Sequence, residues 1–304
     1  MGKRRRAQQL NPISMKYLFL FLVTLPLIAR SQDDMSLLGS SDTTKDYVTA
    51  TFKGSHIINF QSVEVLGKHS LEFMIQHRFG DINGGANSFF GLDNGASIRF
   101  GLSYSNNGRL EFGIGRTNVD KLADGYLKYK LLRQTVQHGM PVSVTLFGGT
   151  YCTLVKDQDK EINGFDKYHY FSDRLAYTLQ AIVARKFTDK LSIQLNPMYI
   201  HYNLVDRITD KNNVWAFGSA FRYKFTNRMA VTAEYGWKYK SYTESEYYNT
   251  LGIGWEIETG GHVFQMFITN STGIADPQFV PHTRTSWKDG GIRLGFNISR
   301  LFNL

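Results

Sequence analysis

Apolar and polar residues alternate along about twelve strand-length segments of this chain. The first places Leu71, Phe73 and Ile75 on one face and Glu72 and Gln76 on the other. The same rule recurs at 96–104, 110–115, 126–131, 191–199, 215–225, 231–238, 251–258 and 292–299, and more weakly at 141–152, 174–187 and 262–270. A period of two predicts β-strands in a sheet whose two faces meet different surroundings.

The connections between these segments alternate in length. Short turns are predicted at 106–108, 188–190, 226–228 and 259–261, with a slightly longer one at 133–140. Long connections are predicted at 81–94, 153–173, 204–213, 240–246 and 271–289, with a modest one at 116–123. Bacterial outer-membrane barrels have short periplasmic turns, longer outer loops and an even strand number. We therefore expect an all-β, antiparallel, up-and-down transmembrane β-barrel of about 12 strands with both termini in the periplasm.

The two faces of the predicted strands differ in charge. The apolar face is rich in Leu, Ile and Phe, and Tyr and Trp recur near strand ends, as Tyr104, Tyr199, Trp237 and Tyr239 do. Such aromatic residues mark membrane interfaces. A soluble barrel would have to turn its charged face to water and enclose an implausibly wide apolar interior. The pattern therefore favours lipid outside the barrel.

The opposite face would line the lumen. It collects nine cations (Arg78, Arg99, Lys128, Lys130, Lys186, Arg222, Lys224, Lys238 and Arg293) and six acids (Glu72, Glu111, Asp124, Glu234, Glu256 and Glu258). Such a set can pair into a salt-bridged filling or line a wet channel. Both alternatives stay open from the sequence.

The net charge of +9 does not indicate nucleic-acid binding. Residues 1–31 hold six Lys and Arg and no acid, so 9 − 6 leaves +3 for the remainder. Aromatic residues make up 14% of the chain, with 28 Gly and only 6 Pro, which suits many strands joined by tight turns. The single cysteine, Cys152, excludes an intramolecular disulfide and a Cys-rich metal site.

The N-terminus is expected to direct export. Lys16 precedes an apolar run from Tyr17 to Ala29 that is too short to span a membrane, and Ala29 and Ser31 place small residues at positions −3 and −1 of a cleavage site. We expect a signal peptide with an N-terminal extension over 1–31, cleaved before Gln32, with translation starting at Met1 or Met15. A periplasmic N-terminal segment over 32–68 and the barrel over 69–304 would follow. The stretch 46–68 alternates as a strand would and is expected to thread into the barrel or lie beneath it.

Several short motifs resemble a known family. They are His77 to Asn83, Phe89 to Asp93, Ile98 to Gly101, Gly113 to Arg116 and Asp124 to Gln134. Together they resemble the outer-membrane β-barrel family catalogued as domain of unknown function 5777, from about Val48 to the C-terminus. The resemblance implies a barrel and export to the outer membrane. It implies no activity, so no functional residue carries over from it.

Candidate site residues are few. The connection from Asn83 to Asp93 is rich in Gly and carries Phe89 and Phe90. It is expected to be either an ordinary outer loop, the favoured interpretation, or an inward-folding constriction built on Phe89, Phe90 and Asp93.

Neither the histidines nor the acidic run at 157–161 indicates a site. The histidines, among them His77, His169, His201 and His282, form no constellation with a nucleophile and an acid. Asp157, Asp159 and Glu161 have calcium-loop spacing but lack the required Gly and closing Glu. No catalytic residue, cofactor or metal is therefore expected.

Three functions remain open from the sequence. The first is a passive or gated pore for small solutes with a weak anion bias. The second is a structural or docking platform for envelope partners, and the third, ranked last, is a barrel enzyme that acts on lipids. The expected partners are the lipids of the outer membrane and its assembly machinery, and not nucleic acid.

Overall fold

The structure is a computed structural model that describes residues 46–137, 139–156, 167–205, 210–239 and 247–304. The predicted signal peptide and cleavage site fall on residues 1–45, outside these ranges. Asp157, Asp159 and Glu161 lie outside them as well.

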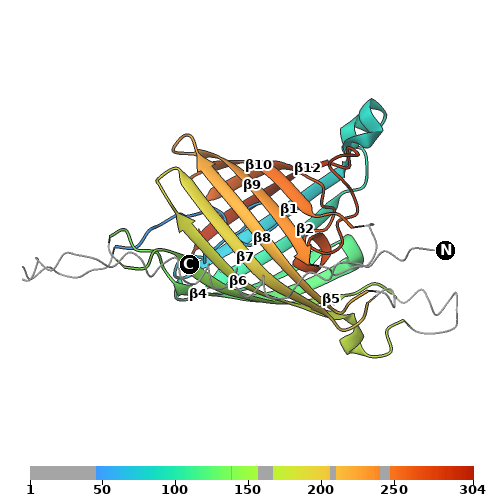
Figure 1. The fold of residues 1–304 in the computed structure, drawn as a ribbon, viewed down its shortest axis with the longest axis horizontal. Helices are drawn as coiled ribbons and strands as arrows, with labels where there is room; N and C mark the ends of the chain where they lie inside the picture. Colours follow the sequence, from blue (N-terminus) through green and yellow to red (C-terminus); the bar gives the residue numbers. More distant parts are fainter. Residues whose placement is uncertain (1–45, 138, 157–166, 206–209, 240–246) are drawn as a thin grey trace, which may run out of the picture. The chain divides into compact units, whose positions relative to one another are not determined.

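In the described residues twelve strands form one closed barrel (Figure 1). They are β1 (Ser70–Asp81), β2 (Ser97–Ser105), β3 (Leu110–Thr117), β4 (Leu122–Leu132), β5 (Ser143–Thr153), β6 (Leu175–Lys186), β7 (Leu191–Tyr202), β8 (Asn213–Lys224), β9 (Met229–Tyr239), β10 (Thr250–Thr259), β11 (His262–Thr269) and β12 (Arg293–Asn303). Each strand pairs antiparallel with the next along the chain, and β1 closes the barrel against β12 with Ser70 opposite Asn303. The predicted 12-strand antiparallel barrel is confirmed.

The two ends of the barrel differ as the connections predicted. The short turns 106–109, 187–190, 225–228 and 260–261, together with 133–142, join strands at one end, the short-turn end. β1 begins and β12 ends at this same end. The opposite, long-loop end holds the short helices η1 (Ile82–Gly91), η2 (Val119–Lys121), η3 (Phe171–Arg174) and α3 (Asp276–Phe279).

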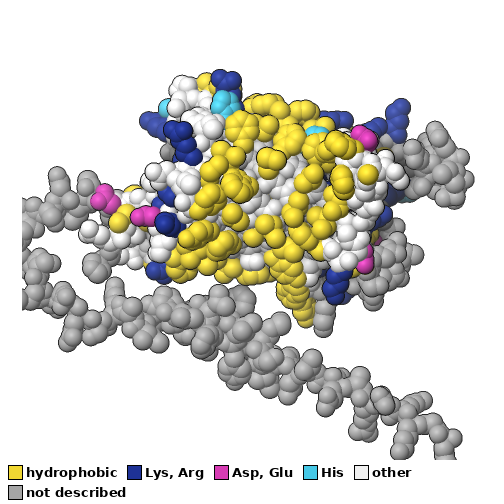
Figure 2. Space-filling model, turned by 90° about the horizontal axis from the view of Figure 1, so that it is seen from above, with side chains coloured by type: hydrophobic (Ala, Val, Ile, Leu, Met, Phe, Trp, Pro, Cys, Tyr) yellow, Lys and Arg dark blue, Asp and Glu magenta, His cyan; other side chains and the backbone are white. Residues whose placement is uncertain are grey.

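The outer face of the wall is apolar. Ile114 and Trp215 are 65% and 61% exposed, and many other Leu, Ile, Phe, Trp and Tyr side chains on the strands are exposed too. Figure 2 shows hydrophobic side chains gathered over the outer wall, with charged side chains toward its two ends. Among the described residues no helix is long and apolar enough to cross a membrane. An apolar exterior of this kind suits a barrel surrounded by lipid.

The core lies inside the barrel. Side chains of the wall alone do not fill it, because two further segments enter the lumen from opposite ends. Residues 51–66, here called the plug, precede β1, and residues 270–292, here called the cap loop, connect β11 to β12. Apolar side chains of both segments are buried against the inner face of the strands.

Candidate functional site

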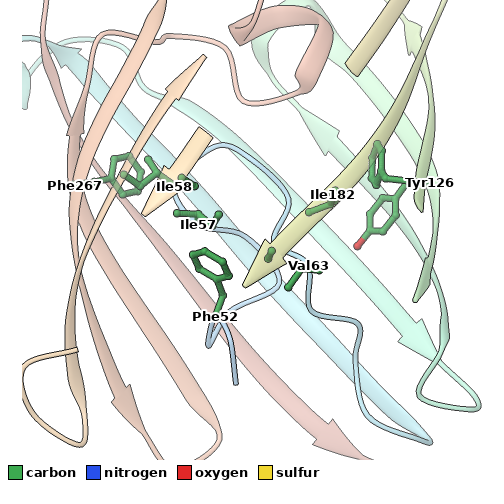
Figure 3. Packing of buried hydrophobic residues seen from close by; sticks show 10 residues of the cluster. Phe52, Ile57, Ile58, Val63, Tyr126, Ile182 and Phe267 are labelled. Atoms are coloured by element: carbon green, nitrogen blue, oxygen red, sulfur yellow. The ribbon is translucent and has the colours of Figure 1, made fainter. Parts of the chain in front are cut away.

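The plug is a hairpin inside the lumen. Its two arms meet at a bridge between His56 and Gln61, and the amide of Ile57 donates to the carbonyl of Phe60, 2.9 Å away. All its residues from 51 to 63 are buried except Lys53. Figure 3 shows Phe52, Ile57, Ile58 and Val63 among the barrel strands. Of the two placements expected for the stretch 46–68, the structure shows the threaded one for the plug.

The tip of the plug is anchored on one carboxylate of the wall. Glu234 on β9 accepts hydrogen bonds from the backbone amides of Ile58 (3.1 Å), Asn59 (2.9 Å) and Phe60 (3.1 Å). The side-chain amide of Asn59 donates to the same carboxylate at 2.6 Å. Successive amides that converge on one group form a cradle for an anion. Here the anion belongs to the wall, and hydrogen bonds to a charged acceptor are the strong kind.

The opposite side of the tip is held by a cation. The Arg78 guanidinium on β1 donates to the carbonyl of Ile58 at 3.2 Å and to the side chain of Asn59 at 3.1 Å. Asn297 on β12 also donates to the Ile58 carbonyl, at 2.9 Å. The turn therefore bridges two buried wall groups of opposite charge, and wall side chains satisfy its three amides and the carbonyl of Ile58.

The arm of the plug that follows the tip, from Gln61 to Leu66, has its own wall partners. Gln194 on β7 accepts from the amide of Val63 at 2.7 Å, and Thr145 donates to the Val63 carbonyl at 2.6 Å. Glu111 accepts from the amide of Leu66, and Lys128 donates to the carbonyl of Glu64. A segment that forms no strand in the sheet thus pairs its backbone with side chains.

The wall is shaped to receive the plug. A Cβ atom added at Gly218 or at Gly236 would lie 2.9 Å from the ring of Phe60, and one at Gly252 would lie 3.1 Å from Ile58. Any other residue at these positions would push against the tip. The three glycines on β8, β9 and β10 therefore form the pocket that the tip occupies.

Two pairs of buried wall charges bind each other rather than the plug. The Nε atom of Arg99 donates to Asp124 at 2.9 Å, and Arg222 lies 2.8 Å from Glu256. Both pairs are almost fully shielded from solvent. Burial of such charges is tolerable only when they are paired in this way.

The cap loop closes the lumen from the long-loop end. All its residues from 273 to 281 are buried. Asp276, at the start of α3, accepts from Tyr151 at 2.9 Å and from the side chain of Gln180 at 2.7 Å. Phe279 packs in one apolar cluster with Phe60 of the plug. The two inserted segments therefore meet inside the barrel.

Two ionisable groups on the inserted segments have shifted pKa values. Burial, followed by the positive charges of Arg99, Lys128 and Arg78, holds the pKa of His56 well below its usual 6.5. Burial, which outweighs the hydrogen bond from Tyr151, raises the pKa of Asp276 from 3.8 to about 7. Both shifts favour the uncharged form, as expected for groups removed from water.

The structure places the ten predicted lumen residues as follows. Arg78, Glu111, Lys128 and Glu234 are buried and bind the plug, and Lys130 lies 2.9 Å from Glu64 of the plug. Arg99 and Arg222 are buried in wall ion pairs. Lys224 and Lys238 are half-buried, and Arg293 is buried beside Thr285 of the cap loop. Most of these charges surround inserted chain rather than an open bore.

The connection from Asn83 to Asp93 stays outside the lumen. Phe89 and Phe90 are 59% and 53% exposed at the long-loop end, and Asp93 is exposed. This loop does not constrict the barrel in the structure. The segments that enter the lumen are instead the plug and the cap loop.

Sequence reasoning did not identify the cap loop or the tip of the plug as site elements. The apolar run Ile57, Ile58, Phe60 and Val63 ahead of β1 is one signal that could have indicated burial of the plug. The apolar residues Ile274, Phe279 and Val280 in the long connection to β12 are a second. Within the described residues no group of three or more His, Cys, Asp or Glu side chains is placed to hold a metal ion.

Several solved structures resemble the chain at low sequence identity. The NanC porin has a TM-score of 0.44 at 10% identity, covering 77% of this chain and 100% of its own. The KdgM porin has a TM-score of 0.43 at 9% identity, with 77% and 99% covered. The outer membrane phospholipase A from Escherichia coli has a TM-score of 0.43 at 10% identity, with 76% and 92% covered. A comparison with curated proteins gives no match.

A family model gives the clearest relationship. The model is described as a membrane bound beta barrel domain, DUF5777, and it matches residues 52–302. This range includes the plug from Phe52 onward, the cap loop and all twelve strands except the last residue of β12. The resemblance seen in the sequence motifs is thereby confirmed, and the chain belongs to this family of membrane-bound β-barrels.

Proposed function

We propose that this protein is an outer-membrane barrel that forms a gated pore for small solutes, and that the plug holds the pore closed. The observation that carries the proposal is the insertion of the plug as a hairpin. It enters beside the bridge between Tyr47 and Thr135 at the short-turn end and returns to Ser70 at the same end. Because both ends of the plug lie at the short-turn end, the plug can leave the lumen through that end. Its exit breaks no hydrogen-bonded pair of barrel strands.

The lumen that the plug would vacate is suited to hydrated solutes. Arg78, Lys128, Gln194, Glu234 and Asn297, which now bind the plug, would face water. Polar and charged linings of this kind conduct solutes, whereas an apolar lining excludes water. The excess of cations on the inner face gives the pore a weak preference for anions.

The orientation in the membrane follows the rule for bacterial barrels. Short turns face the periplasm and longer loops face the outside, so the plug enters from the periplasmic side. Residues 1–31 supply the export signal, and the apolar outer face contacts the lipids of the outer membrane after insertion by the assembly machinery. We assign no catalytic group to the barrel.

Planar-bilayer recording of the purified full chain tests the proposal. Glu234→Gln removes the charge that the tip of the plug binds, which weakens several charge-assisted hydrogen bonds and should cost docking about 3 kcal/mol. The ratio of open to closed states should rise by a factor of about 150. Asp189→Asn is the control, because it also neutralises one carboxylate but in the short turn between β6 and β7, where the side chain is 98% exposed, and it should leave the ratio unchanged.

A second variant tests the proposal independently, in case the Glu234→Gln protein does not fold. Replacement of residues 51–66 and of residues 273–281 by Gly-Ser linkers removes both segments that close the lumen, leaves every barrel strand intact in sequence and should give a constantly conducting barrel. Barrel folding is checked by heat-modifiable migration in gels. Folded barrels of both variants that stay silent in the bilayer would refute the pore and leave a closed structural barrel.

A further inference from the structure

A separate cavity lies at the long-loop end, beyond the contact between the plug and the cap loop. Its volume is about 510 Å³, and it is bounded by η2, the approach to β6, the end of β7 and the cap loop. Tyr168, Arg174, Tyr202, Tyr247, His282 and Arg284 are among the residues that line it. Small-molecule sites are concave regions of this size with a few placed polar groups.

Aromatic rings form one part of the cavity wall. The ring of His282 lies 5.5 Å from that of Tyr202 and 5.2 Å from that of Tyr247, both edge to face. The Arg174 guanidinium stacks 4.2 Å above the ring of Tyr168. Three segments that are far apart in the sequence thus bring tyrosine rings to a single cavity.

Positioned polar groups form the rest of the wall. Arg174 donates to the carbonyls of Val155 at 2.7 Å and Thr153 at 3.3 Å, so its guanidinium is fixed before any ligand arrives. Gln278 of the cap loop donates to Asp120 of η2 at 3.0 Å and holds that carboxylate at the cavity edge. Groups fixed in advance bind a ligand with a smaller loss of entropy.

The charges of the described lining balance. Lys167, Arg174 and Arg284 are matched by Asp120, Asp173 and Asp210. A site for an anionic or a cationic ligand would show an excess of the opposite charge. The cavity shows none among these residues, so its chemistry suits a neutral ligand that is rich in hydrogen-bonding groups.

We propose that this cavity is a binding site for a short neutral saccharide. A sugar ring has a face of C–H groups that packs on aromatic rings, and hydroxyls at its edge that pair with carboxylates, guanidinium groups and amides. The cavity offers both kinds of surface within one volume. The inference goes beyond the pore, because the cavity is present in the closed protein and ligand binding there needs no conduction.

Ligand-observed saturation-transfer NMR on the detergent-solubilised full chain tests the proposal. The probes are three neutral trisaccharides (maltotriose, cellotriose and chitotriose), with trigalacturonic acid and the glucosamine trimer as anionic and cationic comparisons. At least one neutral trisaccharide should bind with a dissociation constant of about 1 mM or tighter. Tyr168→Ala should weaken that binding about tenfold through loss of the stacking surface.

A matched control separates the cavity from the loop surface. Tyr170 lies two residues from Tyr168 but is 74% exposed and does not line the cavity, so Tyr170→Ala should leave binding unchanged. Equal losses in the two variants, binding of only a charged trimer, or no binding of any neutral probe up to about 10 mM would each overturn the site. Saccharide binding by a barrel that never conducts would refute the pore and leave this site intact.

Discussion

Phe60 and Phe279 meet edge to face with their ring centroids 5.0 Å apart, although one enters the barrel from the short-turn end and the other from the long-loop end. Both rings are almost completely buried, at 1% and 0% exposure. The lumen is therefore closed by two pieces of chain that support each other. Loosening of either piece should weaken the other, since each supplies apolar surface that the other buries.

Phe279→Ala tests this mutual support. Truncation of a fully buried Phe costs about 3 to 5 kcal/mol in a protein core. We expect lower stability toward denaturant and more frequent opening in planar bilayers, because Phe60 loses its partner. Phe171→Ala is the control, since Phe171 on η3 is 69% exposed. A Phe279→Ala barrel as tightly closed as the unmodified protein would show that the two segments dock independently.

The buried pair of Arg99 and Asp124 gives a second prediction. Arg99 lies over two glycines, because a Cβ atom at Gly115 or Gly101 would fall within 2.8 Å of its guanidinium. Asp124→Asn leaves that cation without a counter-charge and should destabilise the barrel by about 3 to 5 kcal/mol. The double variant Arg99→Met/Asp124→Leu should recover much of the loss, since no buried charge remains.

Denaturant unfolding followed by gel mobility measures both variants of that pair. Recovery in the double variant would assign the loss to an unpaired charge. A double variant less stable than Asp124→Asn alone would instead show that the pair itself is strongly stabilising.

The sequence predicted the barrel wall more fully than its contents. Alternation at a period of two is a local property, so strand number and the inward placement of side chains such as Arg78 and Lys128 could be inferred from it. The alternation around Phe52 suggested a strand, yet the plug forms none of the barrel strands. Its conformation is set by groups such as Glu234, some 175 residues away in the chain, and a local pattern does not encode contacts of that range.

The cap loop shows the same limit. A long connection at 271–289 was predicted from its length and composition, but nothing local states whether such a loop extends outward or folds in. Its inward course depends on Asp276 meeting Tyr151 and Gln180 of the wall. The exposed positions of Phe89 and Phe90 agree with the interpretation of 83–93 as an ordinary outer loop, which the sequence favoured.

Acid should release the plug through His56. When the plug is docked, the pKa of His56 lies below its usual 6.5. Docking is therefore most stable above about pH 6.5, where His56 is neutral in both states. This stability is lost as the pH falls from about 6.5 toward the lower pKa of the docked state. A protonated ring would be buried near the cations Arg99, Lys128 and Arg78. Open probability in planar bilayers should therefore rise between about pH 7 and about pH 5.

His56→Gln is the control for that titration. The amide can keep a hydrogen bond to Gln61 in place of the 2.8 Å contact of the imidazole, but it does not titrate. Its open probability should no longer rise as the pH falls over the same range. An unchanged acid response in His56→Gln would assign the effect to another group.

The cap loop should respond to pH in the opposite direction through Asp276. The pKa of the docked carboxyl is raised to about 7 from 3.8, chiefly by burial. Protonated Asp276 therefore stabilises docking of the cap loop fully below about pH 4, and this stabilisation is lost as the pH rises through about 7. The groups that face it are Tyr151 and Gln180, with the charges of Asp124 and Arg99 nearby.

A nitroxide label can follow this loop without a conductance assay. Thr272 is exposed on the cap loop, and Cys152 is the only native cysteine, so Thr272→Cys in a Cys152→Ser background gives one labelling position. Label mobility should increase as the pH is raised from about 5 to about 8, because an ionised Asp276 disfavours the buried site. Asp276→Asn keeps a neutral side chain of the same shape and should abolish the change. Mobility that rises equally in both proteins would mean that another group controls the loop.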